Sequence, residues 1–423
     1  MSDSKSKMSF NATWSMAVGG MVGGGIFSVL GVIIRSAAQW AWLSFLIAGL
    51  IALISAHSYS QLAIKYKEGG GAFVFLSKIN HKGFAGSLSW VLILGYVLTL
   101  SVYAFTFGHY VAHVLNAGAW LPRVLALAVI TVLAAVNLKG VSNASKVEVV
   151  TVYGKLFVLL SLAVFGIIKW SPDMLTQGVE SKSWTAAVIG AATIFMAYEG
   201  FQLLTYDYDD LKKPDKTLPK ASLWAVIAVI AIYILVTFGT TMLVGAHTLV
   251  EKKEIALSVA GKQALGITGL ILVTIAAAFS TGSAINATLF STARLMENVA
   301  KKKDLPQLFV KENNENIPYY AILIIAGVAA ALAVIGSLSS LVDAASIIFL
   351  FTFGTVNFIA FTQKVKFKWL CLAGAVACAL AIVTAIYEEM QKSPYIIIAL
   401  IVVIAAVFVF RPYLLGKIRD SNN

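Results

Sequence analysis

The sequence predicts an all-α membrane protein with about twelve transmembrane helices, and three observations support that prediction. Of the 423 residues, 59% are hydrophobic and only 12% are charged, with a mean hydropathy of +0.85. Soluble domains are roughly half apolar and about one quarter charged, so a soluble fold could not cover this much apolar surface. Apolar runs long enough to cross about 30 Å of hydrocarbon recur along the chain, and the basic residues lie between them.

The predicted spans follow one another with short connections. Their approximate bounds are 13–34, 40–64, 86–115, 121–138, 148–168, 184–206, 222–246, 264–297, 318–337, 341–363, 367–387 and 393–411. The polar segment before the first span lacks the apolar core and cleavage site of a signal peptide, so we expect this span to be an uncleaved anchor. The polar stretches between spans are loop-sized, and no large soluble domain is expected.

The basic residues are distributed unevenly between the two sides of these spans. With the N-terminus inside, inner loops and tails hold 23 Lys and Arg residues, outer loops hold eight, and Lys155 falls within a span. Cytoplasmic loops of membrane proteins are enriched in Lys and Arg. We therefore expect a multi-pass protein of the cell membrane with cytoplasmic termini. The net charge of +12 reflects this topology, and nucleic-acid binding is excluded because the basic residues do not gather on a soluble domain.

Three consecutive glycines, Gly23, Gly24 and Gly25, interrupt the first span. Each glycine in a helix interior costs about 1 kcal/mol relative to alanine. One interpretation is close packing of helices through small residues. The other is a broken helix whose freed backbone groups face a cavity. Three glycines together at bilayer depth favour the broken helix.

The sixth span also carries a glycine near its middle, Gly200, beside the ionisable Glu199. Glycine-interrupted segments at corresponding positions of two halves indicate the binding site of an inverted-repeat transporter. Spans one and six correspond if each repeat has five helices. The predicted organisation is then an N-terminal tail, two repeats, a peripheral helix pair and a C-terminal tail, at residues 1–12, 13–168, 184–363, 367–411 and 412–423.

Four sequence motifs resemble the amino acid–polyamine–organocation (APC) superfamily of transporters, and among its branches the proton-coupled amino acid permeases. They cover about residues 14–320 in the family's order. The motifs are the glycine run Met21–Phe27; Tyr59–Ala63 followed by Gly69–Phe73; Phe195–Gln202 followed by Asp209, Lys213-Pro214 and Leu218-Pro219; and Ala284–Ala287 followed by Arg294, Asp304-Leu305-Pro306 and Phe309.

The resemblance implies a core of ten helices in two inverted five-helix repeats, two peripheral helices, and a substrate held between spans one and six. Half-helix N-termini would offer N–H groups to a carboxylate, and half-helix C-termini would offer carbonyls to an ammonium group. We assign the carboxylate to backbone around Gly24 and Gly25, and the amino group to Val22 and the segment Phe195–Tyr198. The predicted binding residues are Val22, Gly23, Gly24, Gly25, Phe195, Ala197, Tyr198, Glu199 and Gln202.

Lys155 lies within the apolar run 149–168. Ionisable residues inside a membrane span are rare and are functional candidates by default. The resemblance implies that its ammonium takes the place of the sodium ion of sodium-coupled relatives, with Ser280, Thr281 and Ser283 and carbonyls of the first span as partners. A lysine that cycles its proton would couple transport to protons. The alternative is that the side chain reaches the interface beside Glu148, roughly 10 Å away along the helix.

Two residues depart from the pattern of the superfamily. At the position of Glu199 the superfamily usually has an apolar residue, and at the position of Gln202 it often has an acid. Glu199 could attract a cationic group, take a proton, or only pair with a polar neighbour. Asp207, Asp209 and Asp210 could attract cations or pair with nearby lysines. The predicted function is therefore secondary transport of an amino acid, coupled to protons, with uptake or exchange of a cationic amino acid or polyamine as the alternative.

Several other classes find no support in the sequence. No GxxxxGK[ST] phosphate loop is present, so no ATPase subunit is expected and transport would use a gradient or exchange. No catalytic constellation indicates an enzyme, and no cofactor or metal is expected, because His109 and His113 offer only two ligands.

Cys371 and Cys378 lie two helical turns apart, too far for a disulfide. Asp343 is interpreted as an interfacial carboxylate.

Overall fold

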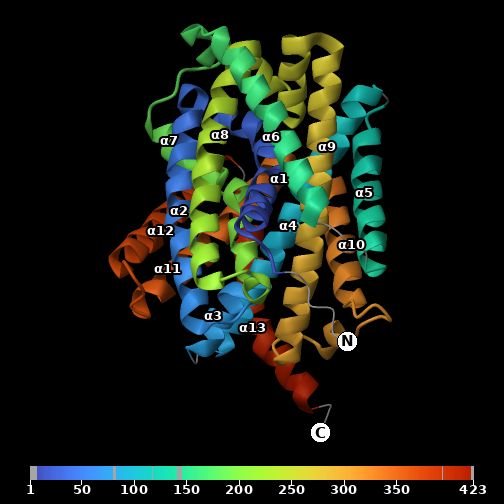
Figure 1. Cartoon of the computed structure of the whole chain (residues 1–423), viewed down its shortest axis with the longest axis vertical. Coiled ribbons are helices and arrows are strands. Elements are labelled where there is room, and N and C mark those ends of the chain that lie inside the picture. Colours follow the sequence, from blue (N-terminus) through green and yellow to red (C-terminus); the bar gives the residue numbers. More distant parts are fainter. Residues whose placement is uncertain (1–6, 80–81, 117, 141–144, 393, 421–423) are drawn as a thin grey trace.

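The computed structural model describes residues 7–79, 82–116, 118–140, 145–392 and 394–420, and within these residues the fold is a bundle of helices (Figure 1). The ends of both predicted tails, residues 1–6 and 421–423, lie outside the described residues. The α-helices are α1 (Phe10–Ala37), α2 (Ala41–Tyr66), α3 (Gly71–Lys78), α4 (Lys82–Leu115), α5 (Leu121–Leu138), α6 (Ser145–Ile168), α7 (Thr185–Thr193), α8 (Pro214–Glu251), α9 (Ala256–Lys301), α10 (Tyr319–Ile335), α11 (Leu338–Thr362), α12 (Lys368–Lys392) and α13 (Pro394–Asp420). Short 3₁₀ helices are η1 (Ala38–Trp40), η2 (Pro172–Leu175), η3 (Phe195–Tyr198), η4 (Phe201–Thr205), η5 (Tyr208–Asp210), η6 (Lys253–Ile255) and η7 (Gln307–Val310).

The helices account for the twelve predicted spans. In the described part of the chain, eight helical segments are long and apolar enough to cross a membrane, and one of them, Phe10–Tyr66, contains both α1 and α2. Two shorter apolar helices, Tyr319–Ile335 and Leu400–Val409, and the interrupted segment α7–η3–η4 complete the set. The chain is therefore a multi-pass membrane protein, and the predicted all-α class is confirmed.

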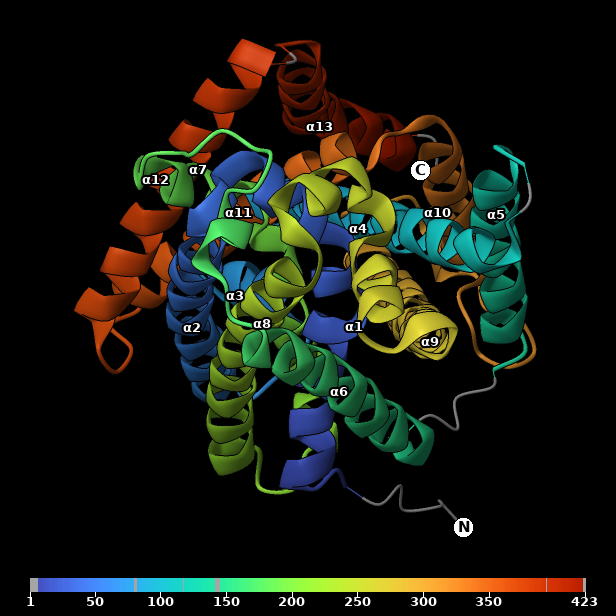
Figure 2. The ribbon, with the colours of Figure 1, turned by 90° about the horizontal axis from the view of Figure 1, so that it is seen from above.

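Apolar side chains on the outer helices also indicate a lipid environment. Val132 on α5, Phe157 on α6 and Val383 on α12 are largely exposed in the isolated chain. Figure 2 shows these helices near the rim of the bundle, with α1 near its centre among α4, α8 and α9. Large exposed apolar surfaces of this kind indicate contact with lipid or a partner, and membrane spans bury them in lipid.

Two long helices bend where the sequence analysis ends one span and begins the next. α8 has non-helical backbone at Gly245, and α9 has it at Leu265 and Gly266. The predicted spans seven and eight end at 246 and begin at 264, so the residues between these kinks form the connection. This connection lies on the upper side of the bundle in Figure 1, whereas α3 and the end of α13 lie on the lower side.

Candidate functional site

The sixth span is broken in its middle, as its glycine predicts. α7 ends at Thr193, and two 3₁₀ turns, η3 and η4, flank an extended Glu199 and a left-handed Gly200 with φ of 134°. A side chain at position 200 would be strained at this φ, and its Cβ would lie 2.7 Å from backbone atoms of Gly20 and Met21. The broken segment therefore packs backbone against backbone on α1.

The first span is not broken in this structure, and the prediction of a break at Gly23–Gly25 is wrong for this conformation. α1 is helical from Phe10 to Ala37. The physical reason is close packing: a Cβ at Gly23, Gly24 or Gly25 would lie 2.7 Å from Ala284 Cβ, 1.8 Å from the Tyr103 ring, or 2.3 Å from the Tyr233 hydroxyl. The three glycines thus admit three neighbouring side chains to the helix surface.

Three side chains from other helices nevertheless bond to carbonyls of α1 near these glycines. The Lys155 ammonium donates to the Gly19 carbonyl at 3.0 Å. The Tyr233 hydroxyl lies 2.7 Å from the Met21 carbonyl and 2.9 Å from the Ala197 carbonyl of the broken segment, and can donate to either. The Ser280 hydroxyl donates to the Val22 carbonyl at 3.1 Å. One turn of α1 therefore receives donors from α6, α8 and α9.

Lys155 is buried, with only 3% of its surface exposed. Its ammonium group points inward and bonds to α1, near the centre of the bundle (Figure 2). This geometry does not match a side chain that reaches out to the interface. Of its predicted partners, Ser280 bonds to the same turn of α1, whereas the Thr281 hydroxyl donates to the Ala277 carbonyl of its own helix. Ser283 is half-buried on α9.

Glu199 lies in the break and is 2% exposed. Its two carboxyl oxygens accept hydrogen bonds from the Tyr103 hydroxyl at 3.2 Å and from the Gln202 amide at 3.4 Å. The same amide nitrogen donates to the Tyr96 hydroxyl at 3.3 Å, and the side-chain oxygen Oε1 of Gln202 accepts the Gly200 N–H at 2.8 Å. A buried carboxyl whose hydrogen-bond donors are neutral can accept a proton or a cationic group.

The other predicted binding residues line the same region. Val22, Phe195, Ala197 and Tyr198 are fully buried. The Tyr198 hydroxyl donates to the Phe45 carbonyl at 2.7 Å, so it holds η3 against α2.

Four polar residues of the site were not found by sequence reasoning: Tyr96, Tyr103, Tyr233 and Ser346. Ser346 on α11 accepts the Met196 N–H at 3.0 Å and donates to the Thr193 carbonyl at 2.5 Å, which satisfies the end of α7. The available signal was a hydroxyl inside an apolar span, since buried tyrosines usually need a partner. Tyr96 and Tyr103 are also two helical turns apart on α4, hence on one face.

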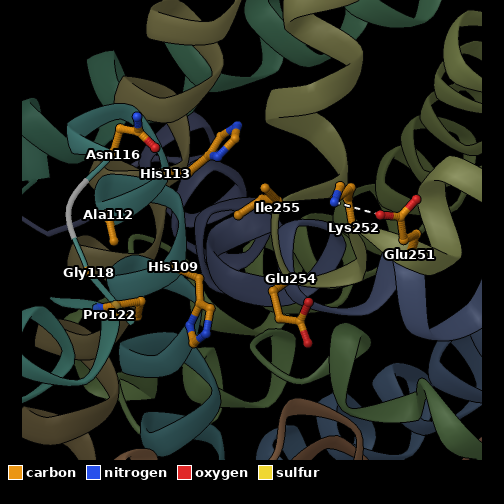
Figure 3. Close-up of a pocket in the computed structure, with 10 residues that line it drawn as sticks. All are labelled: His109, Ala112, His113, Asn116, Gly118, Pro122, Glu251, Lys252, Glu254 and Ile255. Carbon is orange, nitrogen blue, oxygen red and sulfur yellow. Dashed lines mark ion pairs between the residues drawn. The ribbon is translucent and has the colours of Figure 1, made fainter. Parts of the chain in front are cut away.

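Two pockets lie away from the break. One, of about 350 Å³, is lined by His109, Ala112, His113, Asn116, Gly118, Pro122, Glu251, Lys252, Glu254 and Ile255 (Figure 3). Within the described residues, no group of three His, Cys, Asp or Glu side chains is placed to hold a metal ion. The other, of about 310 Å³, is mainly apolar and lies between Trp90 of α4 and Phe309 of η7.

The remaining acidic and thiol candidates lie outside this region. Asp343 is buried on α11, where α12 packs over this part of the helix and brings the buried Glu389 beside it; its position at the membrane interface stays a prediction. Asp209 and Asp210 are exposed in η5, beyond the buried break. Cys371 and Cys378 are free thiols.

Comparisons with known proteins agree with this architecture. The family model described as amino acid permease matches residues 8–410. The inner membrane transport protein YbaT of Escherichia coli is 29% identical over 70% of each chain. The serine/threonine exchanger SteT of Bacillus subtilis is 25% identical over 69% of this chain and 67% of its own.

A solved structure shares the fold. The structure of MhsT in complex with L-phenylalanine covers 90% of this chain and 99% of its own, with a TM-score of 0.67 and 12% sequence identity. At this identity the match shows the fold alone. The family match covers nearly the whole chain and confirms the resemblance of its motifs: the protein is a member of the amino acid permease family, within the APC superfamily.

Proposed function

We propose that this protein is a secondary active transporter of amino acids in the cell membrane, coupled to protons and working by alternating access, with both termini cytoplasmic. The observation that carries the proposal is the broken segment α7–η3–η4 packed on a turn of α1 whose carbonyls are bonded by Lys155, Tyr233 and Ser280. Family membership and relatives such as a serine/threonine exchanger support the substrate class.

In this structure α1 is a continuous helix. The contacts to its carbonyls suggest how it would bind a carboxylate once it opens. In an α-helix each carbonyl accepts from the N–H four residues later. The carbonyls of Gly19, Met21 and Val22 therefore pair with the N–H groups of Gly23, Gly25 and Ile26. If α1 opens at this point, Lys155, Tyr233 and Ser280 keep the carbonyls bonded, and the freed N–H groups can bind the substrate carboxylate.

The substrate's ammonium group is assigned to the broken segment. A break leaves carbonyls without helical partners, and in η3 the Ala197 carbonyl faces α1 and accepts from Tyr233. Glu199, two residues further along the chain, adds a buried carboxyl. Predicted residues from both spans therefore meet in one place, although the substrate site itself requires α1 to open.

Proton coupling is assigned to Lys155. Its ammonium reaches α1 directly, so loss of its proton would remove a charged donor from the Gly19 carbonyl. Hydrogen bonds from charged groups contribute about 1.5–3 kcal/mol. The protonation state of Lys155 would then bias whether α1 stays fixed to α6, which links the proton to the movement of the substrate-binding helix.

Cationic amino acids or polyamines are the second candidate substrates, favoured by Glu199. Its carboxyl oxygens accept hydrogen bonds from the neutral side chains of Tyr103 and Gln202. A cationic substrate would replace these donors with a charge-assisted bond, which is about twice as strong.

Uptake into proteoliposomes tests both functions. The wild type is expected to take up neutral amino acids faster with an inward proton gradient, and Lys155→Ala to lose the gradient's effect. The matched control is Gly154→Ala, because a Cβ there meets nothing within 4 Å. Absence of uptake of every neutral, cationic and anionic amino acid would overturn the proposal. A preference for cations that disappears in Glu199→Gln would establish the second candidate instead.

A further inference from the structure

One tyrosine contacts both parts of the proposed site, the glycines of α1 and the broken segment. Tyr103 on α4 is completely buried, and its ring lies on the Cα of Gly24, where a Cβ would come within 1.8 and 2.0 Å of ring carbons. Its hydroxyl donates to Glu199 of the broken segment at 3.2 Å. The Tyr103 side chain therefore spans from the glycine face of α1 to the carboxyl in the break.

Two other tyrosines around this place make shorter hydrogen bonds, and two phenylalanines pack against α11. Tyr233 lies within hydrogen-bond distance of two backbone carbonyls, and Tyr198 donates to a third at 2.7 Å. Phe195 and Phe201 pack edge-on against Phe353 of α11, at centroid distances of 5.5 and 5.3 Å. By contrast, the Tyr103 hydroxyl makes a longer hydrogen bond of 3.2 Å, to the side chain of Glu199. Of these three tyrosines, Tyr103 makes the longest hydrogen bond, so its displacement breaks the weakest one.

We propose that Tyr103 is the specificity-determining residue of the transport site, because its ring occupies the substrate's place beside Gly24 and limits substrates to amino acids with small side chains. This inference rests on the proposed function. A substrate that binds the backbone of α1 at Gly24 must displace the ring, and the space gained is bounded by the fixed Tyr233, Tyr198 and Phe195. Displacement also releases Glu199, which then faces the substrate.

The pairing of Gly24 with Tyr103 gives the inference its sharpest test. Alanine, serine, leucine and phenylalanine uptake is compared in proteoliposomes for Tyr103→Leu, Tyr103→Phe, Gly24→Ala and the double variant Gly24→Ala/Tyr103→Leu. The wild type is expected to prefer alanine and serine. Tyr103→Leu is expected to raise the leucine-to-alanine uptake ratio at least about tenfold, whereas Tyr103→Phe, which keeps the ring, retains the wild-type ratio.

Gly24→Ala places its methyl group in the Tyr103 ring and is expected to lose alanine uptake at least about tenfold, with recovery in the double variant. Gly327→Ala on α10 is the control, since its Cβ meets nothing within 4 Å. Tyr103→Met replaces Tyr103→Leu if the latter does not fold.

An unchanged ratio in a folded Tyr103→Leu protein, or full activity of Gly24→Ala alone, overturns the role of Tyr103 while the proposed function stands. No uptake by the wild type overturns the proposed function, and this inference with it.

Discussion

The two glycine-interrupted spans behave differently, although the sequence predicts a break in both. The first has three consecutive glycines and is a continuous helix. The sixth has no consecutive glycines, only Gly200 at its break, and is broken on both sides of Glu199. The number of glycines therefore does not decide whether a membrane helix breaks. Glycine lowers the cost of leaving the helix, but the freed backbone groups still need partners in a medium without water.

The partners explain the difference. In the sixth span, Ser346 bonds the Thr193 carbonyl and the Met196 N–H, and Gln202 accepts the Gly200 N–H. One carbonyl and two N–H groups of the break are thus bonded by side chains of the protein. In α1, the side chains that bond to Gly19, Met21 and Val22 all donate to the carbonyls of these residues. Opening α1 would leave N–H groups to be satisfied, which is what a substrate carboxylate supplies.

The largest expected effect concerns the backbone of the broken segment. Gly200→Ala combines a left-handed φ of 134° with a Cβ 2.7 Å from the α1 backbone. Strain and overpacking each cost about 1–3 kcal/mol, so we expect a loss of unfolding free energy of roughly 3 kcal/mol or more. Thermal unfolding of the purified protein measures this loss, with Gly327→Ala as the unaffected control. A wild-type melting temperature for Gly200→Ala would show that the break does not depend on Gly200.

The next effect concerns the hydroxyl shared by the two spans. Tyr233→Phe leaves the Met21 and Ala197 carbonyls without this donor, at an expected cost of about 1–3 kcal/mol. Tyr110→Phe is the matched control, because its hydroxyl donates to the Phe27 carbonyl on the same helix, beyond the glycines, at 3.1 Å. Both variants should lower stability, but only Tyr233→Phe should weaken substrate binding in equilibrium binding measurements. Equal binding losses in both would assign Tyr233 a structural role alone.

Most of the fold follows from local patterns in the sequence, and the site follows only in part. Apolar runs locate the spans because lipid imposes their length, and even the kinks near Gly245 and Leu265 fall at predicted span ends. The short helix α3 was not predicted, since eight residues are too few to show a span. Glu199 and Lys155 were found because an ionisable residue within an apolar run can be recognised from the sequence alone.

Contacts between distant spans cannot be found in this way. Tyr233 and Met21 are 212 residues apart, and Tyr103 and Glu199 are 96 apart. Whether their hydroxyls point at α1, at the break or at their own helix depends on helix rotation, which hydrophobic patterns leave undetermined. The same limit explains the incorrect break in α1, because its continuity depends on which side chains pack against its glycines.

The smallest expected effect concerns the Ser280 bond to α1. It distinguishes a bond that keeps α1 helical from one that satisfies a carbonyl when α1 opens. Ser280→Ala removes the 3.1 Å bond to the Val22 carbonyl, which costs about 0.5–1.5 kcal/mol. If this bond only fixes α1, its loss should speed hydrogen exchange of the amides at Gly23–Ile26. If it satisfies the carbonyl when α1 opens, its loss should slow that exchange and lower substrate affinity a few-fold.

We expect the second result, measured by hydrogen exchange and mass spectrometry in detergent. Thr292→Val is the control on the same helix, because the Thr292 hydroxyl bonds to its own helix at 2.6 Å. Faster exchange in Ser280→Ala with unchanged affinity would mean that the carbonyl contacts hold α1 closed. The glycines of the first span would then serve packing alone, and the broken sixth span would have to supply the substrate's backbone contacts by itself.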